Sequence, residues 1–262
     1  MTISKFHQVF SSKKPLLGVI HMPALPGYKN HPGMNKVIKK TLKDLDTLER
    51  AGYNGILVEN DGDHPPHIGP NAAITHHFSE VMKVILQHAK VPIGIEILYD
   101  MPGTVELAAT LKICFVRLDV FSDSGKTPYG PIVSAEPEKI VNIKTSLNKD
   151  LILFTDIQVK HLIMLNKKTI KDSVTQAIKF GSDGIIITGT WTGKKPSFKD
   201  CIEAKKYSGD IPVLVGSGLS STNAEKILSV LDGGIVATAI KNGDYIDLKK
   251  AKALVSLVNK KE

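Results

Sequence analysis

The chain has 262 residues, of which 42% are hydrophobic and 23% charged, and its formal net charge is +8. These values fit one large folded core and exclude a disordered or low-complexity protein. Every apolar run is far shorter than the roughly 20 residues that a membrane-spanning helix needs. The start of the chain shows no secretion signal, so we expect a cytoplasmic protein without a membrane span.

The positive charge does not indicate a nucleic-acid partner. The lysines are spread over predicted helix faces and the C-terminal tail, without interleaved aromatic residues or a known nucleic-acid-binding signature. Solvated helix faces account for most of this charge. A basic surface also favours small anionic substrates through its summed electrostatic field.

Short β-rich runs alternate with segments of helical periodicity along the whole chain. The predicted strands are Leu16–Met22, Gly55–Asn60, Ile93–Leu98, Phe115–Phe121, Leu151–Gln158, Gly184–Gly189, Val213–Ser217 and Gly234–Ala239. The predicted helices are Met34–Ala51, Ala72–Ala89, Thr104–Leu111, Pro137–Leu147, Ile170–Phe180, Phe198–Tyr207, Thr222–Leu231 and Leu248–Val258. Gly52, Gly181 and Gly209 follow predicted helices, where a left-handed residue is common.

Eight strand–helix units predict an α/β protein with a (β/α)8 TIM barrel, as one domain over residues 1–262 with a core at about 15–258. A doubly wound open sheet is the alternative. That fold does not naturally take eight equivalent units, and no linker divides the chain.

Polar side chains gather at the expected carboxyl ends of the first five strands, where a TIM barrel carries its chemistry. The candidates for catalysis are His21, Glu59, Arg117, Asp119, Asp156 and Lys160, and the substrate-binding candidates beside them are Asn60, Glu96 and His161. Strand alternation directs Arg117 and Asp119 to one face, and does the same for Asp156, Gln158 and Lys160.

These groups have more than one interpretation. The carboxylates either pair with Arg117 and Lys160 in a structural network, transfer protons, or hold a divalent cation such as Mg²⁺. No fixed spacing marks such a metal site, so the sequence leaves the cofactor open. His21 is either an acid–base group or a buried core histidine, and Lys160 forms a Schiff base or pairs with an anion. Adjacent His76 and His77 are expected to direct their rings apart, which disfavours a metal site there.

The last strands predict a phosphate site. In a phosphate-binding barrel this site lies in the loops after strands seven and eight. Small residues let backbone N–H groups approach an anion closely. The phosphate-binding candidates are Gly193, Gly216, Ser217, Gly218 and Thr238, with Thr188 and Thr190 as further substrate-binding candidates. Trp191 either stacks on a substrate ring or packs in the fold.

Two long segments, Asp63–Pro70 and Phe121–Pro131, follow strands two and four. Both are rich in Pro or Gly and extend over the same end of the predicted barrel. Either segment could act as a lid over the site.

Several residue strings occur together and in order over roughly Leu16 to Val258. They are Gly18–Gly27, Gly55–Asp63, Phe115–Val120, Asp156–His161, Thr188–Gly193 and Gly216–Gly218. Together they resemble the BtpA/SgcQ family. The resemblance implies a phosphate-binding type of barrel without a settled reaction. The family takes its name from a role in photosystem I accumulation in cyanobacteria, whereas other members resemble proteins of sugar-metabolism operons.

The sequence departs from the family pattern in two places. Glu96 and Tyr99 stand where the family usually has Asn and Arg, and Asp123–Thr127 replaces a string of the Thr-Asp-Gln-Gly type. The substrate of a relative therefore does not carry over to this chain by resemblance.

Two functional hypotheses follow. The first is an enzyme, of the isomerase, lyase or hydrolase class, that acts on a phosphorylated sugar or nucleoside-like metabolite. The second is a non-catalytic assembly or stability factor, as the photosystem role of relatives implies. The many chargeable groups at one barrel end favour the enzyme. A homo-oligomer stays open, because helix periodicity does not separate an interface from packing on the barrel.

Overall fold

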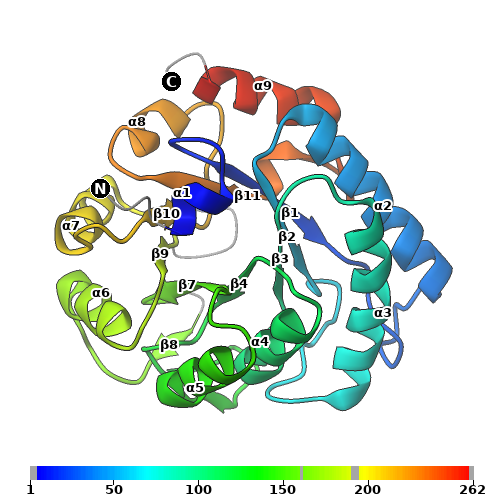
Figure 1. The fold of residues 1–262 in the computed structure, drawn as a ribbon, viewed down its shortest axis with the longest axis horizontal. Coiled ribbons are helices and arrows are strands. Elements are labelled where there is room, and N and C mark those ends of the chain that lie inside the picture. Colours follow the sequence, from blue (N-terminus) through cyan, green and yellow to red (C-terminus); the bar gives the residue numbers. More distant parts are fainter. Residues whose placement is uncertain (1–4, 160–161, 190–194, 260–262) are drawn as a thin grey trace.

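The computed structural model describes residues 5–159, 162–189 and 195–259, which form a closed barrel of parallel strands surrounded by helices (Figure 1). The strands follow one another around the barrel in the order β1–β11–β10–β9–β7–β4–β3–β2. Their bounds are β1 (Leu16–His21), β2 (Gly55–Glu59), β3 (Ile93–Glu96), β4 (Phe115–Leu118), β7 (Ile152–Ile157), β9 (Gly184–Ile187), β10 (Val213–Val215) and β11 (Gly233–Val236). The predicted TIM barrel is confirmed.

The outer helices lie at the predicted segments. They are α2 (Met34–Ala51), α3 (Ala72–His88), α4 (Met101–Thr110), α5 (Pro137–Leu147), α6 (Ile170–Lys179), α7 (Phe198–Tyr207), α8 (Ala224–Leu228) and α9 (Leu248–Asn259). Of these, α4 begins earlier than predicted and α8 is shorter than predicted. Local signals fix their ends. Gly52 ends α2 with φ of 90°, and the Asn71 side chain accepts the amides of Ala73 and Ile74 at the start of α3. Thr169 and Asp172 form a reciprocal capping box at α6.

The strands are shorter than predicted, and this changes where site residues lie. β4 ends at Leu118 rather than Phe121, so Asp119 belongs to the loop that follows it. Gln158 lies beyond the end of β7 with φ of 46°, and its side chain donates to the Lys168 carbonyl instead of sharing a face with Asp156. Asp119 and Gln158 are therefore loop positions rather than strand positions.

A short helix that the sequence did not predict, α1 (Lys5–Val9), covers the amino-terminal end of the barrel (Figure 1). Phe6 and Phe10 are buried and pack on Phe115 and Phe154 inside the barrel. The ring centroids are 6.0 Å apart for Phe6 and Phe154, 5.4 Å for Phe10 and Phe115, and 6.1 Å for Phe10 and Phe154. These rings join one apolar cluster with Val19 and other inward side chains of the strands. The second, larger cluster fills the space between barrel and helices.

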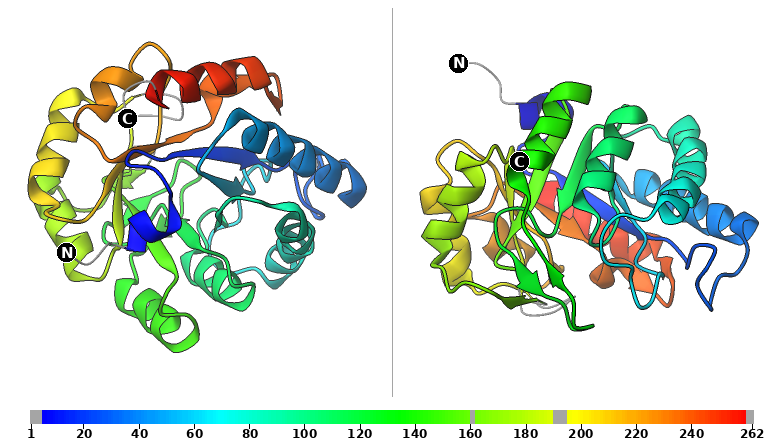
Figure 2. Two further views of the ribbon diagram at one scale, coloured as in Figure 1. Left: turned by 45° about the horizontal axis from the view of Figure 1, so that its top comes forward. Right: turned by 90° about the horizontal axis from the view of Figure 1, so that it is seen from below.

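Small sheets stand at the opposite, carboxyl-terminal end of the barrel. β5 (Gly125–Lys126) pairs with both β6 (Ile132–Val133) and β8 (Ile163–Met164), and β12 (Lys241–Asn242) pairs with β13 (Tyr245–Ile246). In the right-hand view of Figure 2, α1 and the green strands β5 and β6 lie at opposite ends of the molecule. One end is thus closed by aromatic side chains, and the other carries the long loops.

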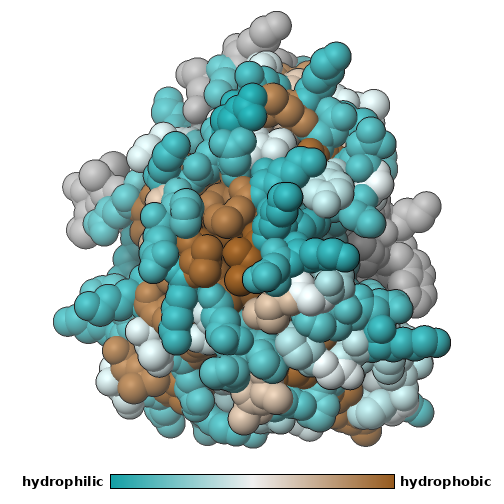
Figure 3. Space-filling model, turned by 90° about the vertical axis from the view of Figure 1, so that its right-hand side faces the viewer, coloured by the Kyte–Doolittle hydropathy of each residue, from teal (hydrophilic) through white to brown (hydrophobic). Residues whose placement is uncertain are grey.

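The outer surface over α2 and α3 is mostly hydrophilic, with an apolar area near its centre and further apolar areas toward its edges (Figure 3). This distribution agrees with charged residues on the solvent-facing sides of the helices. In the described part of the chain, every helix is too short or too polar to cross a bilayer. The predicted homo-oligomer stays a prediction.

Candidate functional site

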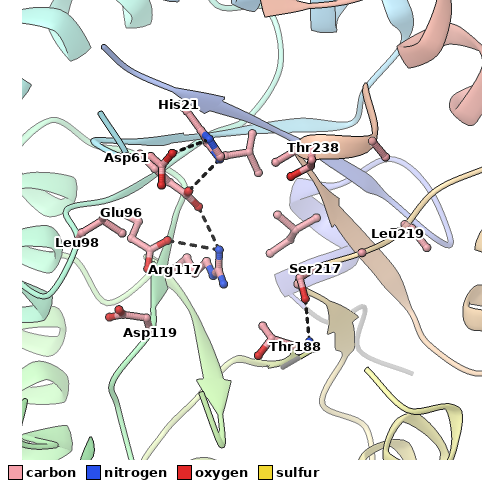
Figure 4. A pocket seen from close by; sticks show the side chains of 18 of the residues that line it. His21, Asp61, Glu96, Leu98, Arg117, Asp119, Thr188, Ser217, Leu219 and Thr238 are labelled. Carbon is pink, nitrogen blue, oxygen red and sulfur yellow. Dashed lines mark hydrogen bonds and ion pairs between the residues drawn. The ribbon is translucent and has the colours of Figure 1, made fainter. Parts of the chain in front are cut away.

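The barrel register brings His21, Glu59 and Glu96 side by side at the carboxyl ends of β1, β2 and β3. His21 is the strand partner of Glu59, and Glu59 is the partner of Glu96. Arg117 follows on the next strand, β4. All four side chains line a cavity of about 620 Å³ at this end of the barrel. With Asp119 they form what we call the acid wall, shown in Figure 4.

Arg117 is the centre of the acid wall. Its guanidinium donates two hydrogen bonds to Asp156, at 2.9 and 3.0 Å, and one to Glu59 at 3.1 Å. Glu96 lies 3.6 Å away. The side chain of Arg117 is only 13% exposed, so these charge-assisted bonds form where water competes little. One cation thus holds three carboxylates in fixed positions.

Asp119 is different, because it has no such pairing. It is 3% exposed, it lines the cavity, and no described side chain donates a hydrogen bond to either carboxyl oxygen; only the backbone amide of Val120 acts on the carboxyl group as a donor. Burial, together with the negative charge of Asp156, raises the pKa of Asp119 to about 7, and the charge of Arg117 offsets only part of the rise. Burial likewise raises the pKa of Glu96 well above its usual range. Asp119 can therefore gain or lose a proton near neutral pH.

His21 forms a dyad with Asp61, which follows β2. The distance from His21 Nδ1 to Asp61 Oδ2 is 2.9 Å, and His21 Nε2 lies 3.6 Å from Glu59 Oε2. Partial burial alone would raise the pKa of Asp61, but the hydrogen bond from His21 and the nearby positive charges lower it to about 2. Asp61 thus stays ionised and orients the imidazole, as the third group does in many acid–base sites. Sequence reasoning did not select Asp61.

Small residues after β10 and β11 form the opposite side of the cavity, the anion wall, which we define as Gly216, Ser217, Gly218, Thr238 and Ala239. Figure 4 shows Ser217 and Thr238 across the cavity from Glu96 and Asp119. The Ser217 hydroxyl accepts the amide of Gly189 at 2.8 Å, which joins the loops after β9 and β10. Thr188 also lines the cavity, and its buried hydroxyl has no hydrogen-bond partner among the described residues.

Glycine is required at two positions of the anion wall. Gly218 has φ of 69°, a conformation that other residues adopt only under strain. A Cβ atom on Gly216 would lie 2.3 Å from Ile186 Cγ2. Lys195, which the sequence analysis did not select, lines the cavity as well and brings a positive charge to it. The wall thus combines close backbone approach with a cation, as an anion site needs.

Two candidates from the sequence do not line the cavity. Asn60 is buried: its amide donates to Asp63 and its carbonyl oxygen accepts the amide of Leu98, so it holds the loops after β2 and β3 together. Asp156 is buried behind Arg117 and positions it. Lys160, His161, Thr190, Trp191 and Gly193 lie outside the described residues.

A group of three metal-ligating side chains occurs elsewhere, on the surface of α3. Ligand atoms of His76, His77 and Glu80 lie within 4.8 Å of one another. The sequence-based expectation that the two rings diverge is wrong, because both turn toward Glu80. Within the described part of the chain, the carboxylates of the acid wall form no such group of three. A cation bound there would therefore take further oxygen ligands from a substrate, as Mg²⁺ commonly does.

Comparison with known proteins identifies the family. A model of the BtpA family matches residues 12–260. The chain belongs to the BtpA family. Among its relatives, an uncharacterized protein of Pyrococcus furiosus is 34% identical over 95% of this chain and 96% of its own length. The photosystem I biogenesis protein BtpA of Synechocystis is 27% identical over 92% of this chain and 85% of its own length.

Solved structures with the same fold include phosphate-handling enzymes. (S)-3-O-geranylgeranylglyceryl phosphate synthase from Thermoplasma acidophilum, in complex with sn-glycerol-1-phosphate, superposes with a TM-score of 0.61 at 15% identity, covering 99% of this chain and 100% of that one. Thiamine phosphate pyrophosphorylase from Pyrococcus furiosus gives a TM-score of 0.58 at 14% identity, covering 95% and 96%. At these identities the likeness shows the fold of the BtpA-family protein alone.

The raised pKa of Asp119 leads to a prediction about stability. Because the folded protein binds this proton more tightly than the unfolded chain, the contribution of Asp119 to stability falls as pH rises from about 4 to 7. We expect Asp119→Asn to be more stable than the wild type at pH 8, by on the order of 2 kcal/mol, with the difference vanishing near pH 4. The full rise in the pKa of Asp119 would give a larger difference in stability, but the neighbouring carboxyl groups change their own ionisation in response and reduce it. Urea unfolding of both proteins at pH 4 and pH 8 measures this difference in stability. A large loss of stability at pH 8 would instead assign Asp119 to a structural network.

Proposed function

We propose that this BtpA-family protein is an enzyme that acts on a small phosphorylated metabolite. The observation that carries the proposal is the arrangement of the cavity, in which Asp119 is buried opposite the anion wall and no described side chain donates a hydrogen bond to it. An unpaired buried carboxyl group is costly to folding, and such groups gather at functional sites. A scaffold protein would gain nothing from it.

The anion wall would hold the phosphate. Gly216 and Gly218 allow the backbone to approach the anion, and Lys195 supplies charge from the loop after β9. The phosphate compounds named for the two structural neighbours are consistent with this choice of ligand. The remainder of the metabolite would then extend toward the acid wall.

The acid wall would transfer protons. Asp119 titrates near neutral pH, which is where an acid–base group is most effective. The imidazole of His21, oriented by Asp61, supplies a second group from β1, which is separated from β4 by β3 and β2. The charge of Arg117 is already balanced by three carboxylates, so we assign it a positioning role rather than stabilisation of a developing charge. Two acid–base groups of this kind suit an isomerase, a lyase or a hydrolase.

One observation favours a second function. The Synechocystis relative is named for photosystem I biogenesis, and it aligns with almost the whole of this chain. An assembly or stability factor that kept the barrel and its anion site would share the fold and the anion wall. It would have no need of a titrating Asp119, so the two proposals differ in what the acid wall does.

A thermal-shift screen tests the enzyme proposal. The panel contains inorganic phosphate, glycerol phosphate, ribose 5-phosphate and nucleoside monophosphates, each with and without Mg²⁺. A ligand at about 100 times its dissociation constant adds roughly 2.7 kcal/mol to stability. We expect at least one sugar-containing phosphate to stabilise the wild type, and Ser217→Asp to abolish the effect by placing a negative charge in the anion wall.

The control for this substitution is Ser146→Asp, which adds the same charge to an exposed position on α5, far from the cavity. It should leave the ligand-induced shift unchanged. A panel without any stabilising compound would favour the assembly factor, and a shift that survives Ser217→Asp would place the phosphate elsewhere.

A further inference from the structure

The cavity has a third region, formed by loops above the acid wall. β2, β3 and β4 are neighbours in the barrel, so the loops that follow them meet at one side of its carboxyl-terminal end. These loops bring ring and apolar side chains to the cavity lining: His64, Pro66, Leu98, Tyr99, Pro128 and Tyr129. We call this set the ring rim. It faces the strands that carry the anion wall from across the barrel.

Two tyrosines define the ring rim. Tyr99 is buried and has φ of 58°, in the left-handed region that a bulky residue adopts only when surrounding structure enforces it. Tyr129 is 50% exposed although it lines the cavity, which leaves much of its ring uncovered. The two phenols are close enough for the charge of one to affect the other. A strained backbone at Tyr99 and an exposed ring at Tyr129 are both features expected of a ligand-binding site.

The size of the cavity matches a ligand longer than a simple sugar phosphate. A volume of about 620 Å³ lies in the middle of the usual range for small-molecule sites, which is about 300–1,000 Å³. A phosphate on the anion wall leaves room for a sugar over Asp119 and for a further group at the ring rim. Aromatic and proline side chains pack well on flat ring faces, and they offer little to a hydrated hydroxyl group.

We propose that the phosphorylated metabolite carries a planar ring, as a nucleotide does, and that this ring stacks on Tyr129 beside Tyr99. This inference rests on the proposed function and narrows its substrate class. The sequence analysis left a nucleoside-like metabolite open but did not select Tyr129, which reaches the cavity through the loop after β4. A bare sugar phosphate would use the anion wall and acid wall and leave the ring rim empty.

The test compares dissociation constants, measured by calorimetry, for ribose 5-phosphate and for purine and pyrimidine nucleoside 5′-monophosphates. We expect at least one nucleotide to bind the wild type more tightly than ribose 5-phosphate. Tyr129→Ser should weaken the binding of that nucleotide by about 5- to 150-fold, the range that loss of one stacked ring gives, while ribose 5-phosphate binds as before.

Tyr245→Ser is the matched control, because Tyr245 is similarly exposed at 42% but packs under Lys43, and it does not line the cavity. Its nucleotide binding should equal that of the wild type. Equal affinity of the wild type for all three ligand classes, or a Tyr129→Ser effect no larger than that of Tyr245→Ser, would overturn the ring proposal while the proposed function stands. If no phosphate compound binds the wild type, both fail together.

Discussion

Arg117→Met is expected to lower the free energy of unfolding by about 3–5 kcal/mol, because it leaves Glu59, Glu96 and Asp156 buried without their shared cation. Methionine fills much of the volume of the arginine stem but cannot donate a hydrogen bond. The loss should depend on pH. The charge of Arg117 lowers the pKa of Glu96 and that of Asp119, so without the guanidinium both values rise; the folded variant then takes up protons at mildly acidic pH and recovers part of its stability there.

Chemical denaturation at pH 5 and pH 8 measures both effects. Arg50→Met is the matched control, because Arg50 pairs with Asp46 at 3.1 Å on the exposed face of α2. An exposed pair at this spacing contributes about 0.3–0.5 kcal/mol. A loss below about 1 kcal/mol for Arg117→Met at pH 8 would contradict the view that one cation holds the acid wall together.

Phe10→Ala should also destabilise the protein, by about 3–5 kcal/mol. Phe10 is 1% exposed, and its ring contacts Phe6, Phe115 and Phe154 at centroid distances of 5.3, 5.4 and 6.1 Å. Removing it opens a void at the closed end of the barrel, where the rigid strands have little freedom to collapse. Thermal and urea unfolding report the change directly.

Phe10→Leu keeps an apolar side chain in the same space and should cost much less. Looser packing in Phe10→Ala should also disturb the cavity at the other end of the barrel. Val19 belongs to the same apolar cluster as Phe10, and it lines the cavity. Near-equal stability of the wild type and Phe10→Ala would show that the packing of Phe10 in the barrel contributes little to stability.

The barrel itself was predictable because its signals are local. Strands buried on both faces produce continuous apolar runs such as Ile185–Ile187, and helices with one buried face repeat every three to four residues. Glycine at the ends of helices fixed their limits, which is why α2 ended where the sequence indicated. The helix α1 was missed because five residues are too few to show a period.

The site was predictable only in part. Arg117 and Asp119 line one cavity, as the sequence predicted, but Asp119 does so from the loop after β4 rather than from the strand. The pairing of His21 with Asp61 was not visible, because it depends on how the loop after β2 turns back. Asn60 was predicted to bind substrate, but its side chain joins the loops after β2 and β3 instead. A polar residue at the end of a strand can have either role, and only the three-dimensional contacts distinguish them.

The packing of Phe6 and Phe10 in the barrel requires residues that are synthesised much later. Phe6 and Phe10 leave the ribosome before one of their partners, Phe154, which emerges about 140 residues later. At roughly 5–20 residues per second, the wait is about 7–30 seconds. During that time the nascent chain exposes two phenylalanines close to its start, in a segment with nothing of its own to bury them. This segment therefore reaches its final place long after it is made, and until then it is available to a chaperone.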